Sequence, residues 1–444
     1  MKQKHSVKSK KREQKNKLSA NYVFRKKGTV MKIKKIISLM LSAVMIVGIT
    51  ACGEQEETVK KAILPDREEF VGLTEWNEAM MQAYLRPYWN TREIYNETIV
   101  FIGEEGEATL MFMPDEIESV KNFGLTEIYK EGRDYTINGN KIKRVKGGKA
   151  PYWELDDYYL KEPNNPQAVI SVNPAQCAYS FEETRYLRYG EQTVFTSKQL
   201  AVTYRHSDAF DGKMPQGQTE KFETIKEKLN GKEKIKVTVY GDSVGVGCNA
   251  SGTIYGGNTK PYMPDGYEMF CKYLERIYGS EVEYSNQATG GWKVENCIQN
   301  YDSRIKDRNI DLLILRIGGN DQNSNKDKFV MEVTILINRF FNDHPDACLL
   351  ILTPQDCNNE STWVVNGKQV ENWIHSAVQD CDRKDRIGIA DAFSFVEWMR
   401  GKGKKDCDWL ANNINHPNDF IIRLYTQLLL TTLLGDDFTE VIYE

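Results

Sequence analysis

The stretch VYGDSVGVGCN, residues 239–249, joins the end of a predicted strand to a glycine-rich loop. The run before it, KIKVTVY at 234–240, is rich in β-branched residues with alternating positions, which favours a strand. Gly241, Asp242 and Ser243 follow this strand, and the glycines around them favour a tight loop. A serine at the end of such a strand is held on a rigid edge, which makes Ser243 a candidate nucleophile.

The rest of the chain after residue 234 alternates predicted strands with predicted helices. Amphipathic patterns predict helices, and short apolar runs predict buried strands, which together indicate an α/β domain with a parallel sheet. In open sheets of this kind, sites form beyond the carboxyl ends of the strands. The expected strands are 236–241, 281–286, 311–319, 347–354 and 386–393, and the expected helices are 266–279, 292–306, 326–342, 365–380 and 419–434.

Polar residues follow the ends of the next two strands as well, in NQATGG at 286–291 and GGND at 318–321, and NHPND at 415–419 lies near the C-terminus. Each stretch alone has an ordinary interpretation as a turn, a loop with an Asx turn, or a structural histidine. Their order and spacing would bring all of them to one rim of one sheet, together with Ser243.

These four blocks resemble those of the SGNH hydrolase family, also called GDSL esterases, over about residues 234–434. The resemblance implies a flavodoxin-like three-layer domain that hydrolyses esters, with no metal or organic cofactor. It implies Ser243 as nucleophile and His416 as base. Gly291 and Asn320 would donate to the oxyanion, and Gly291 is preferred to Gly290 because it lies five residues after Asn286. A serine hydroxyl needs such a base, and an imidazole with a near-neutral pKa suits the role.

One position departs from the family pattern. The family usually has Asp three residues before the histidine, where this chain has Asn413. Asn cannot stabilise an imidazolium by charge, and such a change costs about 10⁴ in rate in a serine protease. Three alternatives follow: a Ser-His dyad oriented by a backbone carbonyl, another acid such as Asp408 or Asp419 at the ring, or an impaired enzyme. Asp242 is interpreted as a structural acid of the loop.

The region before the α/β domain has a different pattern. Short β-type runs separated by turn signals predict a β-sandwich, jelly-roll-like, over residues 71–210. Its many aromatic residues are interpreted as core, with a sugar-stacking surface as the alternative. Residues 211–233 are expected to form a linker, and residues 234–444 the SGNH domain. The predicted strands are 97–103, 108–114, 167–173, 192–197 and 199–205.

The N-terminus predicts export. Residues 31–52 read as a signal peptide with a basic start and a short apolar run, and Ile49 to Cys52 resembles a bacterial lipobox. We therefore expect a lipoprotein anchored through Cys52 to the outer face of the cell membrane, followed by a tether over 53–70. An ordinary signal peptide is the alternative. Residues 1–30 are interpreted as an extension upstream of a true start at Met31.

From Cys52 onward the chain has 45 Lys and Arg against 62 Asp and Glu, a formal net charge of −17. This acidity argues against nucleic acid as a partner. An exported esterase with an aromatic-rich β region resembles enzymes that remove O-acetyl groups from hemicellulose or another glycan, and Trp292 could stack on a sugar or pack internally. The alternatives are a lipase or thioesterase for longer acyl esters, an O-acetyltransferase, and a catalytically impaired glycan-binding lipoprotein.

Overall fold

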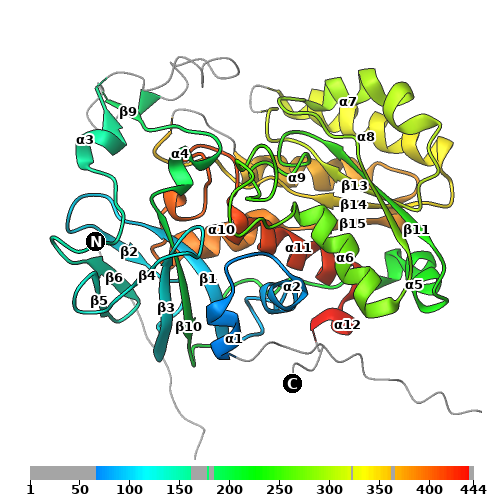
Figure 1. The fold of residues 1–444 in the computed structure, drawn as a ribbon. Coiled ribbons are helices and arrows are strands. Elements are labelled where there is room, and N and C mark those ends of the chain that lie inside the picture. Colours follow the sequence, from blue (N-terminus) through cyan, green and yellow to red (C-terminus); the bar gives the residue numbers. More distant parts are fainter. Residues whose placement is uncertain (1–66, 162–177, 180–184, 322–323, 362–365, 440–444) are drawn as a thin grey trace, which may run out of the picture. The chain divides into compact units, whose positions relative to one another are not determined.

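The computed structural model describes residues 67–161, 178–179, 185–321, 324–361 and 366–439. Its C-terminal half contains a five-stranded, fully parallel sheet in the order β12-β11-β13-β14-β15 (Figure 1). This is the flavodoxin-like strand order 2-1-3-4-5. The strands are β11 (Ile235–Gly241), β12 (Val282–Asn286), β13 (Leu312–Arg316), β14 (Cys348–Leu352) and β15 (Ile387–Ala390).

Helices cover both faces of this sheet because its central strands are apolar on both sides. In β13, Leu312 and Ile314 belong to one core, and Leu313 and Leu315 belong to the other. The first core is completed by helices α6 (Gly266–Tyr278), α10 (Ala392–Gly401) and α11 (Asp419–Leu434), and the second by helices α7 (Val294–Tyr301), α8 (Lys326–Asp343) and α9 (Gly367–Gln379). The three-layer α/β domain predicted from the sequence is thereby confirmed.

Among its described residues, the N-terminal region contains three antiparallel sheets, which confirms that a region built mainly on β-sheets precedes the α/β domain. The first sheet is β1 (Glu93–Val100), β10 (Gln199–Arg205), β3 (Glu116–Asn122) and β4 (Ile128–Tyr129). The second is β2 (Glu107–Thr109), β6 (Lys141–Arg144) and β5 (Tyr135–Asn138), and the third is β7 (Tyr159–Leu160), β9 (Arg185–Leu187) and β8 (Ala178–Tyr179). Four short helices accompany them: α1 (Arg67–Gly72), α2 (Glu78–Tyr84), α3 (Leu155–Tyr158) and α4 (Thr193–Thr196).

Buried polar contacts join the β region to the α/β domain. The Lys404 ammonium lies 2.7 Å from the Glu97 carboxylate of β1, and both side chains are fully buried. Arg423 of α11 donates to the backbone carbonyls of Tyr95 and Asn96 at 2.8 and 2.9 Å. Because an unpaired buried charge is costly, these contacts hold β1 in one position against the α/β domain.

Two predicted segments differ from the structure. Residues 192–197 were expected to be a strand, but residues 193–196 form the one-turn helix α4. The predicted linker contains helix α5 (Glu223–Asn230), whose Ile225 and Leu229 are buried in the core. The short β-branched run at 192–197 has no helical periodicity, so local pattern could not reveal the turn.

Several predictions concern residues outside the described part of the chain. These are the start extension, the signal peptide, the lipid anchor at Cys52, most of the tether, and the strand at 167–173. Among the described residues, no helix is long and apolar enough to cross a membrane.

Candidate active site

The nucleophile loop begins where β11 meets β13. Gly241 has φ +140°, and a Cβ on it would lie 1.7 Å from the carbonyl oxygen of Arg316, so only glycine fits there. The loop then turns, with the Val244 N–H donating to Asp242 Oδ1 at 3.0 Å. Ser243 therefore projects from the carboxyl edge of the sheet, at the position that the sequence predicts.

His416 lies directly beside Ser243. Its Nε2 is 3.0 Å from Ser243 Oγ, which is hydrogen-bond distance for a base that removes the hydroxyl proton. The loop holding His416 is fixed by Asn412, whose Oδ1 accepts from the backbone N–H of His416 at 3.0 Å. Ser243 and His416 are thus 173 residues apart in the sequence and in contact in the fold.

The other ring nitrogen of His416 faces Glu191, which comes from the N-terminal β region. Nδ1 lies 3.2 Å from Glu191 Oε1 and 3.3 Å from Oε2. Burial lowers the pKa of His416, but the charge and hydrogen bond of Glu191 outweigh it and raise that pKa above its ordinary 6.5. A carboxylate on Nδ1 fixes the tautomer that leaves Nε2 free to accept a proton and stabilises the imidazolium. Ser243, His416 and Glu191 have the geometry of a catalytic triad.

The Glu191 carboxylate is held by donors on both oxygens. Oε1 accepts from the Tyr189 hydroxyl at 2.5 Å and from Asn412 Nδ2 at 2.9 Å, and Oε2 accepts from Asn249 Nδ2 at 2.5 Å. Burial raises the pKa of Glu191, whereas His416, Tyr189 and Asn412 together lower it to about 2. The acid is therefore ionised at neutral pH and held in one orientation.

Asn413, at the family's acid position, supports the loop that carries Glu191. It is fully buried with φ +68°, a left-handed conformation that Asn tolerates better than most residues. Its Nδ2 donates to the Arg188 carbonyl at 2.9 Å, and its Oδ1 accepts from Tyr158 and Asn358. An aspartate could not donate to Arg188, so the amide is chemically required by these contacts. Asn413 does not contact the imidazole.

Asp408 and Asp419, which were predicted as possible acids at the imidazole of His416, also have their hydrogen-bond partners elsewhere. Asp408 Oδ1 accepts from the backbone N–H of Val100, and Asp419 Oδ1 accepts from that of Ser251. Both carboxyls are buried, and burial raises both pKa values. The acid at the imidazole is Glu191, which the sequence does not reveal because it lies 225 residues from His416, in the region predicted to be a separate β domain.

Three groups beside Ser243 could donate to an oxyanion. Among described residues, the backbone N–H groups of Ser243 and Gly291 donate no hydrogen bond to the protein. Asn320 Nδ2 donates to the Trp292 carbonyl at 3.0 Å, which fixes the amide and leaves its second N–H. A Cβ on Gly290 would lie 3.8 Å from Ser243 Cβ, so this loop reaches the nucleophile. The choice of Gly291 over Gly290 stays a prediction.

A buried ion pair connects the loops that carry Ser243 and His416. Arg316 Nη1 lies 2.9 Å from Asp242 Oδ2, and both side chains are 2% exposed. Arg316 Nη2 donates to Gln355 Oε1, and Gln355 Nε2 donates to the Asn415 carbonyl next to His416. Asp242 therefore links the nucleophile loop to the histidine loop, in keeping with its interpretation as a structural acid.

Trp292 is partly buried, and its ring is packed against other residues. It meets Tyr240 edge-on at 5.8 Å between ring centroids, and the Arg304 guanidinium lies 5.6 Å from its ring. Its carbonyl positions Asn320. Packing is the role that these contacts support, and sugar contact by Trp292 stays a prediction.

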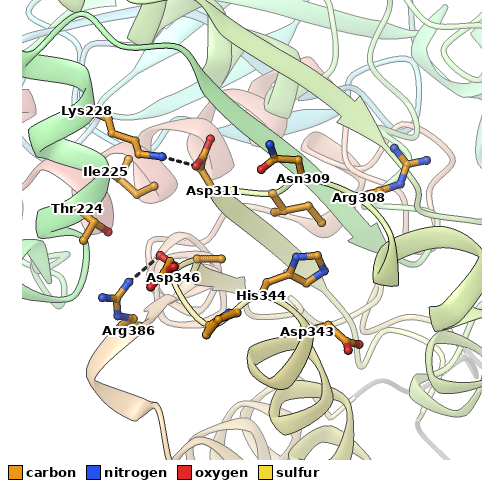
Figure 2. A pocket seen from close by; sticks show the side chains of 13 residues that line it. Thr224, Ile225, Lys228, Arg308, Asn309, Asp311, Asp343, His344, Asp346 and Arg386 are labelled. Carbon is orange, nitrogen blue, oxygen red and sulfur yellow. Dashed lines mark hydrogen bonds and ion pairs between the residues drawn. The ribbon is translucent and has the colours of Figure 1, made fainter.

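The cavity next to the nucleophile is small. It measures about 10 Å³, about enough for one water molecule, and its described lining includes Ser243, Val244, Asn320, Gln355 and Cys357. A larger cavity of about 580 Å³ lies at the opposite, amino edge of the sheet. Figure 2 shows that Lys228 pairs with the Asp311 carboxylate at this cavity, and that Arg386 donates to the backbone carbonyl of Asp346.

No protein-family model matches the chain, and no curated protein matches it. One similar solved structure is a two-domain esterase active on acetylated mannans, co-crystallised with mannopentaose. It is 14% identical to this chain with a TM-score of 0.41, and the match covers 52% of this chain and 58% of that esterase. An acetyl xylan esterase is 18% identical with TM-score 0.34, over 44% and 98%. A member of the lipolytic G-D-S-L family from Veillonella parvula is 16% identical with TM-score 0.35, over 45% and 99%. At these values the similarity assigns no residue and no substrate to this chain.

Proposed function

We propose that this protein is a serine esterase of the SGNH type, whose triad is Ser243, His416 and Glu191. The observation that carries the proposal is the continuous contact from Ser243 Oγ through the imidazole to a fixed, ionised carboxylate. Serine hydroxyls are activated by a base that is itself oriented by a third group. The intact chain of contacts disfavours the impaired, binding-only protein that Asn413 suggested.

The reaction follows from the positions of these groups. Ser243 Oγ attacks the ester carbonyl carbon while His416 Nε2 takes its proton. The negative oxygen then accepts from the backbone N–H groups of Ser243 and Gly291 and from the amide of Asn320, each worth about 3–4 kcal/mol in comparable sites. His416 returns the proton to the leaving alcohol, and the acyl-serine is hydrolysed by water that the same imidazole activates. Glu191 stabilises the imidazolium in both halves.

For the acyl group we propose acetyl. The cavity next to Ser243 has a volume of about 10 Å³, and its described lining is largely polar. A long acyl chain needs an extended apolar surface to gain binding energy, at about 25 cal/mol per Å². The described lining offers no such surface beside Ser243, so it favours a short acyl group such as acetyl over the long acyl chains of a lipase or thioesterase substrate.

For the alcohol we propose a glycan. Tyr255 is 50% exposed, and its carbonyl accepts from Asn249, the same amide that donates to Glu191. The loop carrying this tyrosine therefore adjoins the acid of the triad. An exposed aromatic face offers a flat apolar surface to a sugar ring. Export and a lipid anchor at Cys52 belong to the same proposal, and the mass of the mature N-terminal peptide from native membranes tests them.

The test is acetate release from acetylated xylan and acetylated mannan, with acetyl, butyryl and octanoyl nitrophenyl esters as comparators. We expect acetate release that Ser243→Ala abolishes, and a kcat/KM that falls as the acyl chain lengthens. Preference for octanoyl would replace the proposal with a lipase. If the protein binds these glycans but hydrolyses none of the esters, the proposed esterase function is wrong and the protein is a glycan-binding protein.

A further inference from the structure

A second cavity, of about 400 Å³, lies in the β region between two of its antiparallel sheets. Its walls come from the ends of β3, β4 and β6, the loop after β6, and the segment between α4 and β10. This volume falls in the range of small-molecule sites. The cavity is lined by Asn122, Glu127, Tyr129, Arg144, Lys149, Ala150, Pro151, Tyr152, Ser197 and Lys198.

Tyr152 is held rigidly in this cavity. The Arg144 guanidinium lies 4.0 Å from the centroid of its ring, and its hydroxyl donates to Glu154. Arg144 is itself buried and fixed, donating to the Ala150 carbonyl at 2.8 Å and the Gly148 carbonyl at 2.6 Å. Tyr152 is nevertheless half-buried rather than covered. A fixed, partly exposed aromatic ring binds a flat ligand without losing side-chain freedom.

The charges around Tyr152 favour an anion. Lys149 and Lys198 line the cavity, and among the described residues neither forms an ion pair with a carboxylate; the Lys198 ammonium lies 5.9 Å from the centroid of the Trp153 ring. The only carboxylate in the described lining, Glu127, already accepts from the Tyr129 hydroxyl at 3.2 Å. Two ammonium groups that no described carboxylate neutralises, next to an aromatic ring, suit a sugar that carries a carboxylate.

This cavity is connected to the triad through α4. Glu191 precedes α4, and Ser197 and Lys198, which line the cavity, follow it. Seven residues span at most about 25 Å, and a helical turn shortens that distance. Trp153, next to Tyr152, stacks on Phe195 of α4 with 5.7 Å between centroids. The cavity and the catalytic acid are therefore held by the same short segment.

We propose that this cavity binds a uronic acid residue of the glycan whose acetyl ester is at Ser243, which makes acidic, uronate-bearing glycans the preferred substrates. The sugar ring stacks on Tyr152, and its carboxylate pairs with Lys149 and Lys198. This inference deepens the proposed esterase function and rests on it for the link to Ser243, but binding in the cavity can be measured without turnover.

The experiment compares trigalacturonate with neutral mannotriose by calorimetry, using the full chain with Ser243→Ala. We expect tighter binding of trigalacturonate, weakened about fivefold by Lys149→Ala or Lys198→Ala, and weakened further by added salt. Tyr152→Ala should weaken it about tenfold, and Tyr152→Phe, which keeps the ring, should weaken it much less. Lys146→Ala removes a lysine outside the cavity lining and should change nothing.

Equal affinity for the two trisaccharides, or lysine variants that bind trigalacturonate as tightly as the parent, would overturn the proposal. Lys146→Ala on the Ser243-containing chain should leave turnover of acetyl nitrophenyl ester unchanged, because Lys146 lies outside the described cavity lining and pairs with Glu104. If the chain that keeps Ser243 hydrolyses no ester, the esterase function is refuted, whereas the affinity measured for trigalacturonate still tests the cavity as a binding site.

Discussion

Replacing Glu191 by Gln removes the negative charge next to His416 and preserves the shape of the side chain. Nδ1 lies 3.2 Å from the carboxylate oxygen, and unit charges at that separation attract by about 5 kcal/mol at an effective dielectric constant of about 20. The Glu191 side chain is 34% exposed, so solvent screening reduces this to about 2–3 kcal/mol. The interaction exists mainly once His416 is protonated, so its loss slows the acylation step.

We therefore expect Glu191→Gln to lower kcat for acetyl nitrophenyl ester by about 100-fold, with KM nearly unchanged. Glu360→Gln is the matched control, because the Glu360 carboxylate accepts hydrogen bonds from the Tyr158 and Tyr159 hydroxyls and not from the imidazole. It should keep activity within about twofold. If Glu191→Gln retains activity within threefold of the parent while folding normally, about 0.6 kcal/mol or less depends on the carboxylate and the triad is refuted.

Three further predictions concern the same machinery. Glu191 raises the pKa of His416, so the acid limb of the profile of kcat/KM against pH should lie above pH 6.5. In Glu191→Gln this limb should move to lower pH, because burial then lowers the pKa of His416 without the opposing carboxylate. A limb at the same pH in both proteins would contradict this prediction. Asn413→Asp introduces the residue that is usual in the family but loses the hydrogen bond to the Arg188 carbonyl. Steady-state kinetics should therefore show a lower kcat. A higher kcat would contradict the role of Asn413 in holding the loop that carries Glu191. Asn320→Ala should lower kcat by about 10²–10³, and a change confined to KM would exclude it as an oxyanion donor.

The chemistry that could be predicted from sequence is local. Ser243 follows a predicted strand and His416 lies in a polar stretch shortly before a predicted helix, so the pattern of strands and helices predicted both at one edge of the sheet, and the family resemblance implied their roles. The catalytic acid could not be predicted that way. Glu191 sits in an ordinary Tyr-Gly-Glu turn, and its role depends on how β1 and α11 hold two regions together.

Asn413 shows why the acid prediction went wrong. Asp408 and Asp419 were predicted because both lie near His416 in the sequence. Both are used elsewhere, one at the β1 interface and one at the Ser251 loop. The amide of Asn413 is the sequence feature that could have prompted a wider search, because it indicates that a carboxylate is supplied from another part of the chain.

The most direct test of the triad is covalent trapping of its nucleophile. The full chain would be treated with an alkyl phosphonofluoridate and the adduct mapped by peptide mass spectrometry, with rates measured for the parent, His416→Ala and Glu191→Gln. We predict one adduct, on the peptide containing Ser243, that forms more slowly in Glu191→Gln in proportion to its loss of kcat and hardly at all in His416→Ala. An adduct on another serine, or equal rates in all three proteins, would contradict the assignment of Ser243, His416 and Glu191.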